Sequence, residues 1–385
     1  MKKILALLMA LCMVFALCAC GSSSAPAATE APAAEAPAEA PAEAADGALK
    51  VGVFYYNYGD TYISSVRTAL DAQLDAKGVT YQDFDGNNNQ TTQNEQIQTA
   101  VTDGYNMLVV NMVTSGSSDV ANEIMSIANG IPVVFFNRAV ENDGEEGTVL
   151  GAYDNICFIG TDAPEAGHLQ GKMVGDYLVA NYDAVDLNGD GVISYALMKG
   201  DEANVEAIYR TQYGVEDANA VLAEAGKPAM QYFDEKNTTG YQVDLNGSWS
   251  AQAATDYMNT NLSQYNEANG NMIEVIICNN DNMAEGCISA LETAGFNNGG
   301  DKTIPVFGVD ATESAQELIK AGKMTGTVKQ DAEGMANAIA NTVEAVGAGS
   351  SMVDALAAVV SSADMYSLAE GLSNKLFVAY APFTA

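Results

Sequence analysis

A run of nine residues that begins at Asp186, DLNGDGVIS, has the residue types and spacing of a calcium-binding loop. Oxygen-bearing side chains occupy alternate positions and can point at one centre, and Gly191 stands where an EF-hand loop turns sharply. The oxygen donors would be Asp186, Asn188, Asp190, the carbonyl of Val192 and the hydroxyl of Ser194. Because calcium prefers such hard oxygen ligands, we predict a structural calcium site here rather than a metal-free Asx/Gly turn.

The same run departs from an EF-hand at the position that closes the loop. A bidentate glutamate belongs at the twelfth loop position. Here that position is Leu197, inside an apolar stretch over residues 192–198 that is typical of a strand. A closing carboxylate must therefore come from a distant segment. This favours a loop that staples a larger domain over a helix–loop–helix sensor.

A second group of residues combines carboxylates, amides and guanidinium groups with neighbouring aromatic rings. It comprises Asp60 and Tyr62, Asn137 and Arg138, residues 201–206, residues 279–281, and Asp310. Side chains that both donate and accept hydrogen bonds suit a neutral polyol, whose C–H faces stack on aromatic rings. Trp249, the only tryptophan, lies in the polar stretch NGSWS rather than in an apolar strand.

The elements that must position these residues alternate between short apolar runs and stretches with helical periodicity. The expected strands cover residues 49–56, 79–84, 107–110, 132–136, 156–159, 193–198, 229–233, 273–278, 304–309, 325–329 and 376–380. Apolar strands separated by helices indicate parallel βαβ units. We therefore predict an α/β fold with two doubly wound parallel-sheet lobes, the second of which begins near Ile156.

The polar residues listed above follow the carboxyl ends of these strands, where open α/β sheets bind their ligands. Each also has a local alternative: Asp60 or Asp310 can cap a helix, and Arg210 can pair with Glu206 one turn earlier. Their joint placement at strand ends favours a binding site. No GxGxxG or Walker A pattern follows an expected strand, which argues against a nucleotide-phosphate site.

The first twenty residues have the features of a bacterial export signal. Lys2 and Lys3 precede an apolar run, residues 4–17, which is shorter than the ~20 residues that span a bilayer. The run ends in LCAC, and Cys20 resembles the residue of a lipoprotein signal that is acylated after cleavage; an ordinary cleaved signal peptide is the alternative. Residues 21–48, rich in Ala, Pro and Glu, predict a disordered tether. We expect a protein anchored by lipid to the cell membrane, in the periplasm or at the cell surface.

Charge and cysteine usage narrow the class of protein. A formal net charge of −34 argues against binding to nucleic acid or to an anionic lipid surface. Three of the six cysteines belong to the export signal. The others, Cys157, Cys278 and Cys287, are scattered and odd in number, so they predict no disulfide framework, although a Cys278–Cys287 bridge stays open.

Seven segments, taken together and in order, carry a specific resemblance to a known family. They are YNYGDTY (56–62), PVVFFN (132–137), IGTD (159–162), DLNGDG (186–191), EVIICNND (274–281), PVFGVD (305–310) and GTV (326–328). From about Leu49 to Tyr380 the chain resembles the bacterial periplasmic glucose/galactose-binding proteins, which are ABC-transporter substrate-binding proteins of the type 1 periplasmic binding protein fold.

The resemblance implies how the two lobes are divided and how they work. Residues 49–160 and 329–379 would form the N-terminal lobe, and residues 161–328 and 380–385 the C-terminal lobe with the calcium loop. Three crossover segments, near residues 160–161, 328–329 and 380–382, would join them. Closure about these crossovers would trap the ligand, and a permease would recognise the closed form of a monomeric protein.

The resemblance also implies the site. A pyranose would lie between Tyr62 and Trp249. Polar ligand contacts are implied for Asp60, Asn137, Arg138, Asn204, Glu206, Arg210, Asn280, Asp310 and Gln330. Glu274 is implied as the bidentate calcium ligand that Leu197 does not supply.

Several of these positions depart from the family. Tyr62 replaces Phe, Arg138 replaces Lys, Glu206 replaces Asp, Asn204 replaces His and Gln330 replaces Asn. The longer side chain of Glu206 displaces its carboxylate by more than an ångström, so these changes would re-tune the preferred sugar. Glucose or galactose is our leading expectation. Arg138 and Gln330 are also similar to ribose-binding relatives, which leaves a pentose open.

We therefore expect a sugar-binding protein of an ABC importer and not an enzyme. A role in which the protein presents its bound sugar to a chemoreceptor is compatible with this prediction. The rival from another class is a secreted sugar-processing hydrolase that uses Asp60 and Glu206 as acid and base. Against it, the sequence has no nucleophile elbow and no motif for a metal-activated water.

Overall fold

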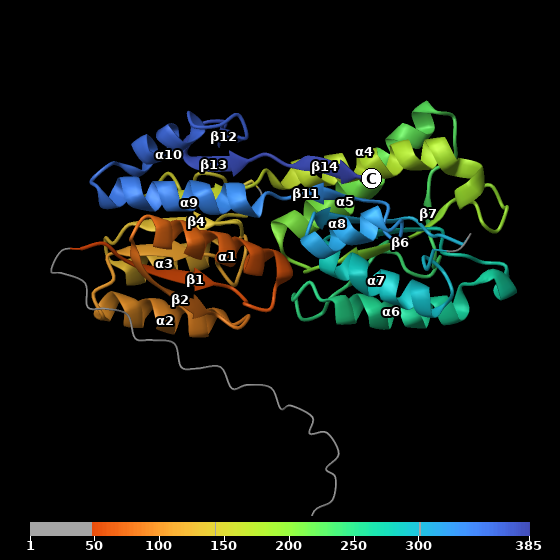
Figure 1. Ribbon diagram of the computed structural model, residues 1–385, viewed down its shortest axis with the longest axis horizontal. Helices are drawn as coiled ribbons and strands as arrows, with labels where there is room; N and C mark the ends of the chain where they lie inside the picture. The colour runs from red at the N-terminus through yellow and green to blue at the C-terminus, as the bar shows by residue number, and fades with distance from the viewer. Residues whose placement is uncertain (1–47, 143, 300–301) are drawn as a thin grey trace, which may run out of the picture. The chain divides into compact units, whose positions relative to one another are not determined.

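A computed structural model describes residues 48–142, 144–299 and 302–385. The predicted export signal, Cys20 and nearly all of the predicted tether lie outside the described residues. Within the described part of the chain, no helix is long and apolar enough to cross a bilayer. Two seven-stranded sheets with helices on both faces organise it (Figure 1).

The first sheet has the strand order β12-β13-β5-β4-β3-β1-β2. Its strands are β1 (Lys50–Tyr55), β2 (Thr80–Asp85), β3 (Met107–Val110), β4 (Val133–Phe136), β5 (Ile156–Gly160), β12 (Tyr366–Ala369) and β13 (Leu372–Val378). The central strands β3 (MLVV) and β4 (VVFF) are buried at every residue, as expected for parallel strands covered on both faces. At the edge, β2 (TYQDFD) has no fully buried residue.

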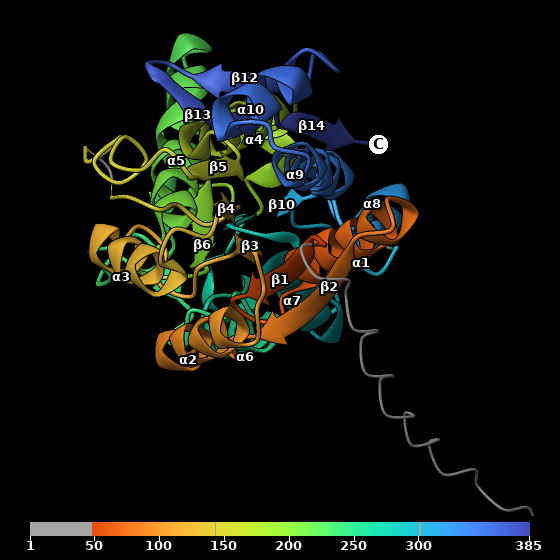
Figure 2. The same ribbon diagram turned by 90° about the vertical axis from the view of Figure 1, so that its left-hand side faces the viewer.

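Five helices cover the two faces of this sheet. They are α1 (Thr61–Ala76), α2 (Gln90–Thr102), α3 (Ser118–Ala128), α9 (Ala332–Gly347) and α10 (Met352–Val360). One face packs against α1, α9 and α10, and the other packs against α2 and α3. The late helices α9 and α10 thus lie with the earliest strands of the chain, as Figures 1 and 2 show.

The second sheet has the order β14-β11-β10-β9-β6-β7, with β8 paired to β6. Its strands are β6 (Ser194–Lys199), β7 (Gln231–Tyr232), β8 (Gln242–Val243), β9 (Val275–Cys278), β10 (Val306–Asp310), β11 (Gly326–Lys329) and β14 (Ala381–Thr384). The helices are α4 (Ala163–Val185), α5 (Val205–Glu224), α6 (Ala251–Gln264), α7 (Asp281–Thr293), α8 (Glu313–Lys320) and the short 3₁₀ turn η1 (Glu267–Asn269). Helices α4 and α5 cover one face, and α6, α7 and α8 cover the other.

The chain passes between the sheets three times. It leaves β5 for α4 at residues 161–162, leaves β11 for α9 at residues 330–331, and leaves β13 for β14 at residues 379–380. This connectivity confirms the predicted class of two α/β lobes joined by three crossovers. The prediction that the second lobe begins near Ile156 is wrong, because β5 pairs with β4 in the first sheet and the chain crosses only after Gly160.

A close contact between α4 and α5 fixes the helix that carries part of the site. Gly167 and Gly171 lie one turn apart on α4 and face the backbone carbonyls of Tyr209 and Tyr213 on α5. A Cβ at either glycine would collide with those carbonyl oxygens. The first two turns of α5, which contain Glu206 and Arg210, are therefore held firmly at the ends of the strands.

The edges of the sheets differ from the prediction. Strand β12 pairs antiparallel to β13, and β14 pairs antiparallel to β11, so both sheets are mixed. The single strand expected at residues 376–380 is two strands, and the strand expected at residues 229–233 shrinks to the two-residue β7. Strands β8 and β12 were not among the expected strands. These short edge elements have weak periodicity, and the register of the neighbouring strand decides their ends.

Two aspartates between α1 and the edge strand β2 give the fold a testable pH dependence. Asp71 and Asp83 are hydrogen-bonded to each other, beside the buried and unpartnered hydroxyl of Tyr55. Burial, followed by the charge of Asp71, raises the pKa of Asp83 to about 8. The folded protein thus keeps a proton that the unfolded chain loses above about pH 4. Stability should therefore fall as the pH rises from about 4 to about 8.

We expect Asp83→Asn to flatten this dependence, because the amide supplies a permanent hydrogen in place of the shared proton. Between pH 6 and pH 8 the wild-type protein should lose about 2 kcal/mol more stability than the variant. Chemical denaturation at the two pH values measures the difference. Asp119→Asn, which removes an exposed charge on α3 at the opposite face of the sheet, is the matched control. Equal slopes for wild type and Asp83→Asn would contradict the assignment.

Candidate functional site

One cavity collects all the residues that the sequence analysis implied for ligand binding. It is lined by Asp60, Tyr62, Asn137, Arg138, Asn204, Glu206, Arg210, Trp249, Asn280, Asp310 and Gln330, together with Tyr56 and Ile63. Asp60 and Tyr62 lie at the start of α1, whereas Asp310 ends β10 in the other lobe. The cavity thus lies where the carboxyl ends of both sheets face each other, as expected for open α/β sheets.

Arg210 is the central cation of this cavity. Its side chain is 4% exposed and donates hydrogen bonds to the carbonyl of Asn279 (2.9 Å), to Oε1 of Gln330 (3.0 Å) and to the hydroxyl of Tyr380 (3.0 Å). Its Nη1 lies 4.0 Å from Oδ1 of Asp310. The guanidinium therefore ties α5 to the ends of β9 and β11 and to the third crossover.

Two buried carboxyl groups flank Arg210. Burial raises the pKa of Glu206, and the charge of Arg210 lowers it. Burial raises the pKa of Asp310 well above its usual value, against the opposing charge of Arg210 and with the charges of Asp281 and Asp60 adding to the rise. Burial thus disfavours the charged form of both groups, and a carboxyl oxygen can accept a hydrogen bond from a ligand hydroxyl in either form.

Three buried donors in this cavity have no hydrogen-bond partner. They are Nε of Arg138, Nε of Arg210 and Nε2 of Gln330. Buried polar groups are normally satisfied, and leaving one unsatisfied costs about 1–3 kcal/mol. All three belong to side chains that line this cavity, which favours a ligand that brings its own acceptors.

Arg138 links the two sheets across the cavity. Its Nη2 donates to the carbonyl of Val113 (3.0 Å) in its own lobe and lies 3.4 Å from Oδ2 of Asp201 in the other. Its guanidinium also stacks over the ring of Tyr56, 4.2 Å from the ring centre. The hydroxyl of Tyr56 in turn donates to Oδ2 of Asp60 (2.7 Å).

Several residues implied as ligand contacts also cap helices, which is the local role that the sequence analysis gave as the alternative to ligand binding. Oδ1 of Asp60 accepts from the amide of Ile63, and Asn204 and Asn280 accept from the third residue of α5 and α7 in the same way. Capping fixes each side chain. The other oxygen of Asp60 accepts from Tyr56, and Nδ2 of Asn280 donates to the carbonyl of Trp249 (3.5 Å), yet a carboxylate oxygen can accept a second hydrogen bond and an amide nitrogen can donate a second one. A cap at a strand end is therefore compatible with ligand binding.

Two aromatic residues from different lobes line the cavity. Tyr62 and Trp249 are each 6% exposed. Trp249 has a positive φ of 54°, which is rare for a bulky residue, and its indole packs where Gly200 has no Cβ. Its carbonyl accepts from Nδ2 of Asn282 (3.0 Å). The backbone is thus held in an uncommon conformation that keeps the ring at the cavity.

Sequence reasoning missed three residues of the site, the apolar Ile63 and two tyrosines. Tyr56 was part of a recognised segment but stood inside the expected strand, and Tyr380 was placed only in a crossover. Tyr380 lies in no recognisable sequence motif. It belongs to the site because its hydroxyl accepts a hydrogen bond from Arg210 and lies 2.9 Å from the hydroxyl of Thr161. Tyr58, which the sequence analysis placed in the same segment as Asp60, instead stacks with Arg67.

The predicted calcium loop folds around the carboxylate of Asp186. Oδ1 of Asp186 accepts from the amides of Gly189 (2.8 Å) and Asp190 (3.1 Å), and Oδ2 accepts from the amide of Gly191 (2.9 Å). Gly189 and Gly191 have φ values of 72° and 84°. Left-handed glycines let the chain wrap tightly, so the oxygen-bearing side chains are gathered on one short loop.

Glu274, which directly precedes β9, reaches this loop as the resemblance implied. It is fully buried; its Oε1 accepts from the amide of Leu187 (2.7 Å) and its Oε2 from the amide of Ser194 (2.9 Å). Burial raises its pKa, three loop amides lower it, and the neighbouring Asp186 raises it further. A buried carboxylate beside a second carboxylate fits a cation. Among the described residues, however, no cluster of three or more His, Cys, Asp or Glu side chains has metal-binding geometry.

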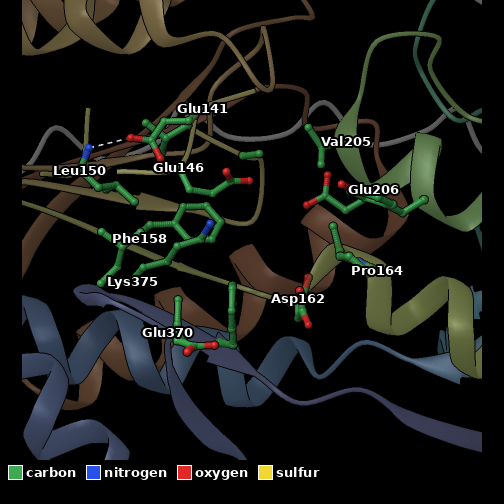
Figure 3. Close-up of a pocket in the computed structure, with 18 residues that line it drawn as sticks. Glu141, Glu146, Leu150, Phe158, Asp162, Pro164, Val205, Glu206, Glu370 and Lys375 are labelled. Atoms are coloured by element: carbon green, nitrogen blue, oxygen red, sulfur yellow. Dashed lines mark hydrogen bonds between the residues drawn. The ribbon is translucent and has the colours of Figure 1, made fainter. Parts of the chain in front are cut away.

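A larger cavity, of about 290 Å³, shares Glu206 with the first. Figure 3 shows the residues that line this larger cavity. It is lined by five acidic residues, Glu141, Glu146, Asp162, Glu206 and Glu370, with Lys375 and the rings of Phe158 and Phe377. Glu141 is satisfied by three backbone amides, including that of Leu150 (Figure 3). We place the site in the smaller cavity because Arg138, Arg210 and Gln330, the side chains with unpartnered buried donors, line it.

Three cysteines lie within the described residues. Cys157, Cys278 and Cys287 are buried and free, with 3.8 Å between the Sγ atoms of Cys278 and Cys287. The bridge that the sequence left open is therefore not formed here.

Comparisons with known proteins agree with this geometry. The family model of the periplasmic binding protein domain matches residues 51–351. The D-galactose/methyl-galactoside binding periplasmic protein MglB of Haemophilus influenzae is 34% identical over 299 residues, which cover 77% of this chain and 80% of MglB. The D-xylose-binding periplasmic protein of Escherichia coli is 26% identical over 266 residues, covering 68% of this chain and 67% of that protein.

A solved structure shows the same fold. The ABC transporter solute binding protein from Bacillus halodurans with bound myo-inositol superposes with a TM-score of 0.64 at 21% identity, covering 89% of this chain and 96% of that chain. Two α/β lobes with a polar and aromatic cavity at their facing strand ends define a solute-binding protein. The chain belongs to the periplasmic binding protein family.

Proposed function

We propose that this protein binds a monosaccharide between its lobes and delivers it to an ABC importer. The observation that carries the proposal is the set of three unpartnered, buried donors on Arg138, Arg210 and Gln330. The carboxyl groups of Asp60, Glu206 and Asp310 line the same cavity. A sugar hydroxyl both donates and accepts, so one ligand can satisfy both groups of side chains.

Glucose or galactose is the ligand we favour. The relative with 34% identity is named for D-galactose and methyl-galactoside. Tyr62 and Trp249 offer apolar faces from the two lobes, which suits the C–H surfaces of a pyranose. A pentose is the second candidate, because more distant relatives are named for D-xylose and ribose and because Glu206, Arg138 and Gln330 are longer than the side chains expected in a galactose site.

Closure of the lobes would trap the sugar. The Arg138–Asp201 pair and a hydrogen bond from Nδ2 of Asn88 to the carbonyl of Asn246 (2.8 Å) join the lobes at the edge of the cavity. These contacts would break when the lobes separate about the crossovers at residues 161–162, 330–331 and 379–380. A permease would then distinguish the closed form from the open one.

The remaining parts of the proposal concern location, metal and chemistry. We propose that the protein works outside the cytoplasm, is anchored through a lipid on Cys20, and acts as a monomer. Calcium would be held by Asp186, Asn188, Asp190, the carbonyl of Val192, Ser194 and Glu274, where it would neutralise the buried carboxylates and fix the loop to β9. We propose binding without turnover, so the sugar should be recovered intact from the complex.

The lone tryptophan gives a direct test. Titration with galactose, glucose, xylose and ribose should change the emission of Trp249 saturably for at least one of them, because the ligand would contact a ring that is 6% exposed. Trp249→Phe should remove the signal while calorimetry still detects the sugar. If none of the four sugars changes the emission or produces binding heat, the proposed ligand class is wrong.

A further inference from the structure

The backbone that presents Asp310 to the cavity is strained. Asp310 has a φ of 123° and the next residue, Ala311, has a φ of 55°. Both values are unusual for residues with a side chain, and each such conformation costs of order 1–3 kcal/mol. Two consecutive residues of this kind persist only where neighbouring contacts hold them.

Two side chains outside the cavity supply those contacts. Thr327 of β11 accepts a hydrogen bond from the amide of Ala311 (3.4 Å), and its hydroxyl donates to Oδ1 of Asp281 (2.6 Å). Oδ2 of Asp281 accepts from the amide of Thr312 (2.8 Å). Two successive backbone amides at the strained turn are thus hydrogen-bonded: that of Ala311 to Thr327, and that of Thr312 to Asp281.

Asp281 also contacts the ligand-binding carboxyl itself. Its backbone amide is hydrogen-bonded to the carboxyl of Asp310. Its side chain is fully buried and lies against Gly308 of β10, where a Cβ would collide with Oδ1. One residue therefore fixes both the backbone of the turn and the orientation of the Asp310 carboxyl.

The surroundings of Asp281 do not favour a buried charge. Burial raises its pKa to about 7, hydrogen bonds from Thr327 and Thr312 lower it, and the nearby Glu285 raises it. A group that costs so much to bury needs a role that an apolar residue could not fill. Accepting two hydrogen bonds at once is such a role.

We propose that Asp281 and Thr327 are positioning residues for sugar binding, which hold the strained turn at Asp310–Ala311 so that the Asp310 carboxyl points into the cavity. The inference rests on the proposed function, because it assigns Asp310 to the ligand. Thr327 lies two residues before the end of β11, from which the chain enters the second crossover. The same pair therefore connects the ligand carboxyl to a segment that bends when the lobes move.

Removing only the hydroxyl of Thr327 tests the proposal. Thr327→Val keeps the shape of the side chain but loses both hydrogen bonds, and a hydrogen bond to a charged group contributes about 1.5–3 kcal/mol. We expect it to weaken binding of the tightest sugar by about tenfold to a hundredfold. Thr327→Ser restores the hydroxyl and should bring the affinity back to within about threefold of wild type.

Thr325→Val is the matched control. Thr325 also bonds a backbone amide of β10, that of Val306 (3.1 Å), but at the opposite end of the strand pair. The Thr325→Val substitution should lower the melting temperature about as much as Thr327→Val does, but it should leave the affinity for the sugar unchanged. Equal affinities for Thr327→Val and Thr325→Val, or a failure of serine to restore binding, would overturn the positioning role. Absence of sugar binding by the wild-type protein would instead overturn the proposed function, since it is measured before any variant.

Discussion

Replacing Arg210 by methionine is expected to abolish sugar binding, with affinity reduced by about a thousandfold or more. The guanidinium is buried between Glu206 and Asp310 and forms hydrogen bonds that fix Gln330, Tyr380 and the end of β9. Truncating a buried, hydrogen-bonded charge at a binding site costs about 2–5 kcal/mol of binding free energy, because its partners lose the hydrogen bonds that position them. Calorimetric titration of the variant with the sugar that wild type binds best measures the loss.

The Arg210→Met variant should still fold. Burial already raises the pKa values of Glu206 and Asp310, so both carboxyl groups can take up a proton when their cationic partner is removed. Arg67→Met is the matched control, since Arg67 lies over the ring of Tyr58 outside the cavity. Binding by Arg210→Met within tenfold of wild type, in a variant with a native circular dichroism spectrum, would remove Arg210 from the site.

Removing calcium from the proposed site in the loop at residues 186–194 is expected to lower the free energy of unfolding more than any other change predicted for this protein. A ligand present at a thousand times its Kd stabilises the folded state by about 4 kcal/mol. For a chain of this size that corresponds to roughly 6 °C in melting temperature. Chelation should therefore lower the melting temperature of wild type by about this amount, and added calcium should restore it.

Glu274→Gln should abolish this response, because the amide cannot act as a bidentate anionic ligand for calcium. In calcium the variant should melt near the temperature of chelated wild type, and chelator should change it little. Glu267→Gln, at an exposed glutamate that pairs with Lys302 on the surface, is the control and should respond to calcium like wild type. An equal loss of stability for Glu274→Gln with and without calcium would show that Glu274 has only a structural role.

The division into α/β lobes could be predicted because the central strands are continuous apolar runs between helices. Strands such as VVFF and VIIC are buried on both faces, and this pattern is visible without a structure. The edges could not be predicted in the same way. Strands β7 and β8 have two residues each, and β12 is defined by its antiparallel pairing with β13, so pairing rather than composition sets their limits.

The site was predictable to the extent that its residues follow strand ends. Asp60, Asn280 and Asp310 are examples, and the structure brings them to one cavity as expected. The role of Tyr380 could not be predicted, because Tyr380 is far from these residues in sequence and only the third crossover places its hydroxyl beside Arg210. The positive φ values of Trp249, Asp310 and Ala311 also have no sequence signal, since none of these residues favours that conformation.

Calorimetric titration of the purified protein with galactose, glucose, xylose and ribose, in the presence of calcium, tests the central claim most directly. We predict one-to-one binding of at least one of these sugars, with a hexose tightest, and recovery of the same sugar unchanged from the complex. Tight binding of a pentose alone would keep the sugar-binding function and assign the changed preference to Glu206, Asn204 and Gln330. No binding of any of the four, by a folded protein, would contradict the account.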